Sequence, residues 1–281
     1  MSEFETDSGG VALAGEEETP EEGDASAALL LMHGLTATRR YVLHGSHHLP
    51  RHGTSLISYD ARGHGRSGAA SEGTYDYEHL ADDAEAVIEA RLGEGRPVLA
   101  GHSMGAHTAA TLALRGPERY AAAVLISPAV RGEPPPQETI EYWEKLAAGL
   151  ESDGVEGFVR AYEDGINPDW RETVLRITRQ RLEAHEHPDA VATALREVPQ
   201  SVPFEGLGSL EAMQLPVLVV ATRDEADPGH PYDVAAAWAE ALPEAELVSE
   251  DEGESPLAWR GGLLSREIER FLGTDAVRER L

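Results

Sequence analysis

Short, almost purely apolar runs recur along the chain. Residues 27–32 form such a run, which ends at His33 and Gly34. A run this short and this apolar is typical of a strand buried on both faces of a parallel sheet. The same pattern predicts further strands at residues 54–59, 97–100, 121–126, 216–221 and 245–248.

Between these runs, apolar residues are spaced as on one side of a helix. The spacing predicts helices at residues 77–92, 104–114, 232–242 and 263–272. Strands that alternate with helices indicate an α/β fold, in which a mostly parallel central sheet is flanked by helices on both faces. Ahead of them, residues 4–18 predict a hairpin that turns at Ser8, Gly9 and Gly10.

The alternation stops between residues 131 and 215. No strand is predicted there, and the pattern is mostly helical, with Asp169 expected to cap one helix and Pro188 expected in the first turn of another. We expect residues 131–215 to be an inserted helical cap above the carboxyl edge of the sheet, where open α/β sheets bind ligands. Residues 1–130 and 216–281 would then form the core of one domain.

The chain is strongly acidic. Its 51 acidic residues against 23 basic ones give a formal net charge of −28. Such a charge repels nucleic acid phosphates and anionic lipid headgroups alike. We therefore expect neither a nucleic acid nor a membrane as partner, and nothing in the sequence sets the oligomeric state.

The chain has no cysteine, which excludes disulfides, thiolate metal sites and a cysteine nucleophile. Its first residues lack the basic and apolar regions of a signal peptide. No apolar run approaches the ~18 residues of a membrane span. These features predict a cytoplasmic protein.

The strongest signal for chemistry is Gly101-His102-Ser103-Met104-Gly105, between a predicted strand and a predicted helix. A Gly-x-Ser-x-Gly sequence in this context is typical of a nucleophile on a strained turn, where flanking side chains would clash with the backbone. The helix N-terminus also favours the negative charge that develops during acyl transfer. We therefore expect Ser103 to be a nucleophile.

With this motif the chain resembles the α/β-hydrolase superfamily over nearly its whole length. His33-Gly34-Leu35 is similar to the family's oxyanion segment, which implies that the backbone N–H groups of Leu35 and Met104 hold the oxyanion. Residues 60–67 resemble the family's turn after the next strand, for which we expect a structural role. The insert is most similar to those of esterases, enol-lactonases and cofactor-free haloperoxidases, which implies that no cofactor is needed.

In this family the catalytic acid follows a late core strand. Asp224 matches that position without a gap, three residues after Ala221, and is the expected acid. Asp227 is the alternative, because it precedes a proline, as that acid often does.

The family's catalytic histidine should follow the last strand, but Glu254 stands there and none of the 12 histidines lies beyond His230. We expect His230 to replace it, because its loop belongs at the same edge of the sheet as Ser103. The alternatives are that His230 is a surface residue of a turn, or that Glu254 is the base, since a desolvated carboxylate can have its pKa raised toward neutrality.

A metal site is not expected. His44, His47, His48 and His52 fall close together, and His44 and His48 lie one helical turn apart, but no carboxylate nearby in the sequence completes a zinc site.

The remaining histidines have structural or peripheral roles in this interpretation. We expect His33 and His102 to be structural or to line the pocket, and His185 and His187 to lie on the surface of the insert.

Together these residues predict a serine hydrolase that cleaves a small carboxylic ester, lactone or thioester through Ser103. A cofactor-free perhydrolase is an alternative, because the same residues make peracids when peroxide replaces water. The histidine missing from the family's position motivates another alternative, a fold of this kind that binds a small ligand without turnover. The expected partner is a small molecule in every case.

Overall fold

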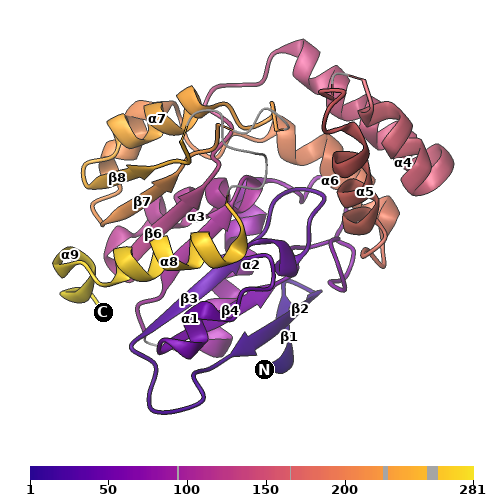
Figure 1. The fold of residues 1–281 in the computed structure, drawn as a ribbon. Coiled ribbons are helices and arrows are strands. Elements are labelled where there is room, and N and C mark those ends of the chain that lie inside the picture. Colours follow the sequence, from indigo (N-terminus) through magenta and orange to yellow (C-terminus); the bar gives the residue numbers. More distant parts are fainter. Residues whose placement is uncertain (94, 165, 224–226, 252–258) are drawn as a thin grey trace.

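A computed structural model describes residues 1–93, 95–164, 166–223, 227–251 and 259–281. Its centre is an eight-stranded sheet in the order β1-β2-β4-β3-β5-β6-β7-β8 (Figure 1). The strands are β1 (Ser2–Ser8), β2 (Val11–Glu18), β3 (Ala27–Met32), β4 (Thr54–Tyr59), β5 (Val98–His102), β6 (Ala122–Ile126), β7 (Val217–Val220) and β8 (Ala245–Val248).

All neighbouring strands from β4 to β8 in this order are parallel. β1 and β2 form an antiparallel hairpin, and β2 pairs antiparallel with β4. The predicted hairpin and the predicted mostly parallel sheet are therefore both confirmed.

Helices cover both faces of the sheet, as the alternation of strands and helices predicts. Successive residues of a strand point to opposite faces, and in β3 Leu30 and Met32 join one core cluster while Leu29 and Leu31 join the other. The first cluster includes residues of α2 (Tyr77–Arg91), α3 (Met104–Arg115) and α7 (Tyr232–Ala241). The second includes residues of α1 (His48–Arg51), α8 (Gly261–Leu272) and α9 (Asp275–Arg278).

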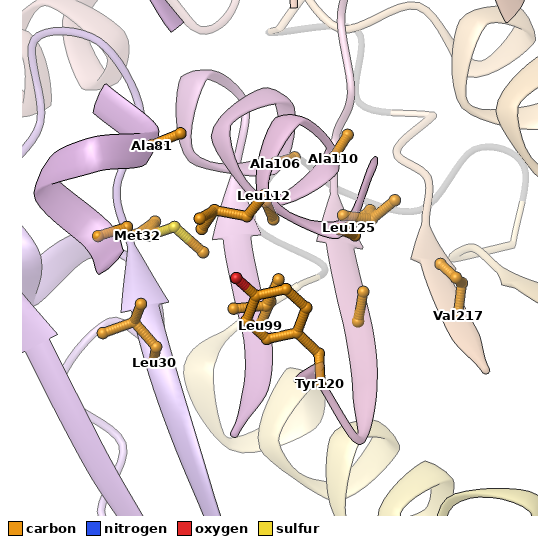
Figure 2. Close-up of a cluster of buried hydrophobic side chains, with 14 of the residues drawn as sticks. Leu30, Met32, Ala81, Leu99, Ala106, Ala110, Leu112, Tyr120, Leu125 and Val217 are labelled. Atoms are coloured by element: carbon orange, nitrogen blue, oxygen red, sulfur yellow. The ribbon is translucent and has the colours of Figure 1, made fainter. Parts of the chain in front are cut away.

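The helix that follows the nucleophile motif packs closely on the sheet. Ala106 and Ala110 of α3 lie over the strands that carry Leu30, Leu99 and Leu125 (Figure 2). Because alanine side chains are small, the backbone of α3 approaches the strands closely, and its first turn is held at a fixed position against the carboxyl edge of the sheet.

The chain between β6 and β7 contains three longer helices, α4 (Gln137–Tyr162), α5 (Arg171–Leu182) and α6 (Pro188–Glu197), which gather at one end of the molecule (Figure 1). In its described part this insert has no strand. Leu182 of α5 joins residues of α4 and α6 in a hydrophobic cluster of the insert, against which Leu35 of the core packs. Whether residues 131–215 form a separate cap domain stays a prediction.

Pro188 lies in the first turn of α6, as predicted. The expectation for Asp169 is wrong, because the residue that precedes α5 is Trp170 and no side chain caps this helix. Asp169 is one position too early, and its backbone N–H donates a hydrogen bond to Oδ1 of Asn167 at 3.0 Å.

Short 3₁₀ helices complete the fold, at Arg39–Tyr41, Pro117–Arg119, Val198–Gln200 and Leu207–Ala212. Among the described residues, no helix combines the length and the apolar character needed to cross a bilayer.

Candidate active site

Ser103 is the single residue between β5 and α3, and its backbone is strained. Its φ of 52° and ψ of −114° lie outside the regions that L-residues normally adopt. Hydrogen bonds fix it on both sides, because its N–H donates to the carbonyl of Ile126 at 2.9 Å and its carbonyl accepts from His107 N–H at 3.0 Å. Strand and helix together therefore hold the serine in a conformation that it would not adopt alone.

The two glycines of the motif are required by packing. A Cβ atom on Gly101 would lie 2.0 Å from the carbonyl oxygen of Gly105, and one on Gly105 would lie 2.1 Å from the carbonyl oxygen of Met32. Both distances are far shorter than van der Waals contact, and both involve backbone atoms. The clash predicted for side chains at these positions is confirmed.

His230 lies beside the serine. Its Nε2 is 2.8 Å from Oγ of Ser103, and its Nδ1 is 2.7 Å from Oδ2 of Asp227. Because an ionised carboxylate only accepts hydrogen bonds, Nδ1 carries the proton and donates to Asp227, and Nε2 accepts from the serine hydroxyl. Three side chains thus form one continuous chain of hydrogen bonds.

A turn at the carboxyl end of β7 brings the acid and the histidine together. The N–H of His230 donates to the carbonyl of Asp227 at 3.2 Å, and α7 begins two residues later at Tyr232. At the start of this loop, Glu250 accepts hydrogen bonds from Thr222 Oγ1 at 2.8 Å and from the N–H of Arg223. The first residues of this loop are therefore hydrogen-bonded to the segment that follows β8.

The electrostatic balance at Asp227 favours its ionised form. Burial of its carboxyl group works against ionisation, but the charge and the hydrogen bond of His230 outweigh this effect and keep the pKa of Asp227 below its ordinary value. Asp224 and Glu254, the expected acid and the rival base, lie outside the described residues. The carboxylate described next to His230 is thus the alternative acid, Asp227.

The predicted oxyanion segment, His33-Gly34-Leu35, lies directly against Ser103. A Cβ atom on Gly34 would lie 3.4 Å from Cβ of Ser103. The segment turns sharply, because Ala37 N–H donates to the carbonyl of Gly34 at 3.0 Å and Thr36 has a φ of 67°. Within the described residues, neither the N–H of Leu35 nor that of Met104 has a protein acceptor.

Two histidines lie in or beside this segment, and His33 is buried. Nδ1 of His33 donates to the carbonyl of Gly34 at 2.8 Å, and its Nε2 accepts from Ala61 N–H at 2.9 Å. His33 is therefore structural, as expected. His102, whose pKa burial and then His230 lower to about 3, has its ring centroid 5.4 Å from that of His230 and lines the site.

His185 contradicts the expectation that it lies on the surface of the insert. Only 9% of it is exposed. Its Nε2 donates to the carbonyl of Thr36 at 3.0 Å and its Nδ1 accepts from the N–H of Gly65 at 2.7 Å. His185 therefore joins the insert to the oxyanion segment. Its partners are too far away in the sequence for a local pattern to predict this link. His187 is exposed, as expected.

The turn at residues 60–67 has the structural contacts expected of it. Asp60 is buried and accepts hydrogen bonds from the N–H groups of Arg39 at 2.8 Å and Arg66 at 3.0 Å, and it also pairs with the guanidinium of Arg39.

Known proteins are similar to this chain in sequence and in fold. The model of the family described as serine aminopeptidase, S33, matches residues 23–163, half of the chain, including the oxyanion segment and Ser103. A protein from Rhizobium rhizogenes with the name "Putative carbamate hydrolase RutD" is 32% identical over 200 residues, which cover 70% of this chain and 74% of the relative. The chain belongs to the α/β-hydrolases.

Other relatives of this hydrolase lie at similar distance. A protein of the same name from Agrobacterium fabrum is 30% identical over 233 residues, covering 82% of this chain and 87% of the relative. Among solved structures, the enol-lactonase from Burkholderia xenovorans LB400 has a TM-score of 0.75 at 20% identity, covering 96% of this chain and 100% of that one. The bromoperoxidase from Bacillus anthracis has a TM-score of 0.77 at 17% identity, covering 97% and 100%. These two structures show the shared fold, and the predicted fold class is confirmed.

Proposed function

We propose that this hydrolase cleaves small carboxylic esters, lactones or thioesters, with Ser103, His230 and Asp227 as its catalytic triad. The observation that carries the proposal is the continuous chain of hydrogen bonds, 2.8 Å from Ser103 to His230 and 2.7 Å from His230 to Asp227. Nucleophile, base and orienting carboxylate are recognised by this geometry rather than by their order in the sequence.

Acylation follows from the positions of the protons. His230 Nε2 takes the hydroxyl proton as Oγ of Ser103 attacks the acyl carbon, and the negative charge moves to the carbonyl oxygen. The free N–H groups of Leu35 and Met104 donate to this oxygen, in the manner of an oxyanion hole. The imidazolium of His230, stabilised by Asp227, then protonates the leaving alcohol or thiol.

Deacylation reverses the roles. A water molecule gives its proton to Nε2 of His230 and attacks the acyl group, and the serine oxygen leaves with that proton as the acid is released. If hydrogen peroxide took the place of water, the product would be a peracid, so a perhydrolase activity uses the same residues. The insert would cover this site as a cap.

The alternative of a binding protein without turnover rests on a serine that lacks a base. His230 at 2.8 Å from Ser103 Oγ argues against it. The relatives named as carbamate hydrolases make a carbamate a further candidate substrate, since its carbonyl carbon is open to the same attack.

A fluorophosphonate probe tests the proposal directly, because it reacts with an activated serine and not with an ordinary one. We expect wild-type protein to be labelled and Ser103→Ala to remain unlabelled. A panel of 4-nitrophenyl esters, a lactone and a carbamate would then establish the substrate class. Absence of both labelling and hydrolysis in well-folded wild-type protein would overturn the proposal.

A further inference from the structure

Arg181, near the end of α5, has a guanidinium group without a partner among the residues that the structure describes. Its Nε is buried and makes no hydrogen bond. Within the described chain, its other side-chain nitrogens have neither a hydrogen bond nor an ion pair. A buried N–H group that lacks a hydrogen-bond partner costs free energy, so such a group in a folded protein calls for an explanation.

The other arginines that are not fully exposed differ from Arg181 in this respect. Each has at least one protein acceptor: carboxylates for Arg39, Arg62, Arg131, Arg179 and Arg196, and backbone carbonyls for Arg280. Acidic residues are abundant in this chain, with 51 in total. In the described part of the chain Arg181 therefore lacks a partner, even though acidic residues are abundant there.

The end of α5 lies against the candidate active site. Leu182, the next residue, belongs to the cluster on which Leu35 packs. His185, about one helical turn further, is hydrogen-bonded to the carbonyl of Thr36. Beyond the effects of burial and of His230, the charge of Arg181 lowers the pKa of Asp227 and of His102, so its field reaches both residues.

We propose that Arg181 binds a carboxylate of the substrate. The substrate class would then be esters or lactones whose acyl part carries a second, ionised carboxyl group. A guanidinium group matches a carboxylate through two parallel hydrogen bonds, and the substrate would supply the partner that the protein does not. This inference rests on the proposed serine hydrolase function.

The overall charge of −28 does not oppose this assignment at short range. Solvent-exposed charges are screened over about 8 Å at physiological ionic strength, whereas Arg181 would act in direct contact. The net charge would slow the approach of an anionic ester, and Arg181 would favour it once bound.

The test compares two series of 4-nitrophenyl esters with equal numbers of acyl carbons. One series ends in a methyl group, from pentanoate to octanoate, and the other ends in a carboxylate, from glutarate to suberate. In wild type we expect one or more of the carboxylate esters to have a higher kcat/KM than its methyl counterpart. In Arg181→Gln we expect that advantage to fall by about 10- to 100-fold, mainly through KM.

Arg179→Gln is the matched control, because Arg179 lies on the same helix and pairs with Glu156. It should leave both series unchanged, and the effect of Arg181→Gln on the methyl-ended series should be much smaller than its effect on the carboxylate esters. If wild type hydrolyses both series but shows no preference for the carboxylate esters, or if Arg181→Gln slows both series equally, the inference is wrong while the proposed function stands. If wild type hydrolyses neither series and is not labelled by a fluorophosphonate, the proposed function itself fails.

A second and independent observation concerns the face of the sheet that α1 and α8 cover, opposite the face that α3 covers. One ligand atom from each of His48, His52 and Glu269 lies within 4.8 Å of the others. Nε2 of His48 is 2.7 Å from Oε2 of Glu269. The carboxylate that the sequence did not place near these histidines is thus supplied by a helix far along the chain.

The surrounding contacts prepare these groups for a metal ion. Nδ1 of His52 donates to the carbonyl of His48 at 2.7 Å, which leaves its Nε2 as a free lone pair, as in many metal-binding histidines. α8 packs closely on the segment that leads into α1, since Ser265 Oγ lies 2.9 Å from Ser46 Oγ and a Cβ atom on Gly261 would lie 2.0 Å from the carbonyl oxygen of Leu43.

We infer that His48, His52 and Glu269 bind a divalent transition metal ion, with Zn²⁺ as the best match to two imidazoles and one carboxylate. Water would complete the tetrahedral coordination. The ion would join α1 to α8 and would not take part in the proposed catalysis.

Titration calorimetry of tag-free protein with Zn²⁺, combined with thermal unfolding, tests this site. We expect binding of about one equivalent and a higher Tm with Zn²⁺, because an ion that binds only the folded state stabilises it. His52→Ala and Glu269→Gln should each weaken binding by at least about tenfold. His47→Ala is the control, since His47 also faces a carboxylate, Glu18 at 2.7 Å, but has no second histidine there. A wild type without saturable Zn²⁺ binding, or equal losses in His47→Ala and His52→Ala, would contradict the site.

Discussion

Asp227 and His230 lie three residues apart in one loop, and Oδ2 of Asp227 accepts a hydrogen bond of 2.7 Å from Nδ1 of His230. The loop follows β7 and leads into α7. In the usual order of the family the histidine follows the last strand instead. The proposed acid and the proposed base therefore belong to a single turn, and only this turn has to be aligned with Ser103 for the three groups to meet.

We expect Asp227→Asn to lower kcat on the order of 10⁴-fold, because an amide would no longer hold the imidazole in the correct tautomer or stabilise its charge. Asp224→Asn, at the position that the family pattern favours, is the control and should change kcat by less than about tenfold. Steady-state kinetics on a 4-nitrophenyl ester measures both. A larger loss of kcat in Asp224→Asn than in Asp227→Asn would show that Asp224 is the catalytic acid.

His230→Ala should abolish most of the turnover, since Ser103 would lose the base that lies 2.8 Å from its hydroxyl. Glu254→Gln should keep wild-type kcat/KM across the pH range. The pH dependence of kcat/KM in both variants separates the two candidate bases. If activity survives in His230→Ala and disappears in Glu254→Gln, the base is Glu254.

Ser103→Ala should lower kcat on the order of 10⁶-fold while the free energy of unfolding changes by less than about 1 kcal/mol. The small effect on stability is expected because the strain lies in the backbone, with φ at 52°, and alanine has the same backbone restrictions as serine. Denaturant unfolding beside single-turnover kinetics provides the two numbers. Turnover close to that of wild type would show that another residue is the nucleophile.

Much of the fold could be predicted from local patterns. β3, β4 and β8 have the bounds that the sequence predicts. β3 shows the physical reason, because it lies inside the sheet with both faces covered and is apolar throughout its length. The start of α5 was mistaken because a capping sequence at Asp169 is a weak signal, and no side chain caps this helix. Local patterns thus predict buried strands more reliably than they predict the residue at which a helix begins.

The candidate site could be predicted only where its residues are close in sequence or follow a strand. The sequence alone suggested Ser103 from its motif and His230 from its position at the correct edge of the sheet. It ranked Asp227 second, because the spacing from the strand does not show how the loop turns. His185 and Glu269 were missed, since their partners lie 120 to 221 residues away and only the fold brings them together.

Gly105→Ala should destabilise the protein by about 2–3 kcal/mol and reduce soluble yield, because the new methyl group would lie 2.1 Å from the carbonyl oxygen of Met32 and would push α3 away from β3. Gly208→Ala is the control, since a Cβ atom there has nothing within 4 Å and its φ is not in the left-handed region. Urea unfolding of both variants measures the difference. Equal stability of the two would mean that α3 does not pack as closely as described.

The hydrogen bonds by which His185 joins the insert to the oxyanion segment should be lost in acid. Burial lowers the pKa of His185 from 6.5 to about 4, because it disfavours the charged imidazolium more than the hydrogen bond to the Thr36 carbonyl favours it. The neutral ring is also the form whose Nδ1 can accept the hydrogen bond from Gly65 N–H. The unfolded chain therefore binds this proton first as the pH falls. The contribution of His185 to the free energy of unfolding is fully present above pH 6.5 and is lost as the pH falls toward 4.

We expect His185→Gln to remove this share of the pH dependence, so that its free energy of unfolding falls less steeply between pH 7 and pH 4 than that of wild type, by up to about 3 kcal/mol. His187→Gln replaces an exposed histidine of the same insert and should keep the wild-type slope. Other buried histidines, such as His102 and His107 with pKa values lowered to about 3, titrate in all three proteins and cancel in the comparison. Urea unfolding at a series of pH values measures the slopes, and identical slopes for the two variants would show that His185 does not have to stay neutral to join the insert to the oxyanion segment.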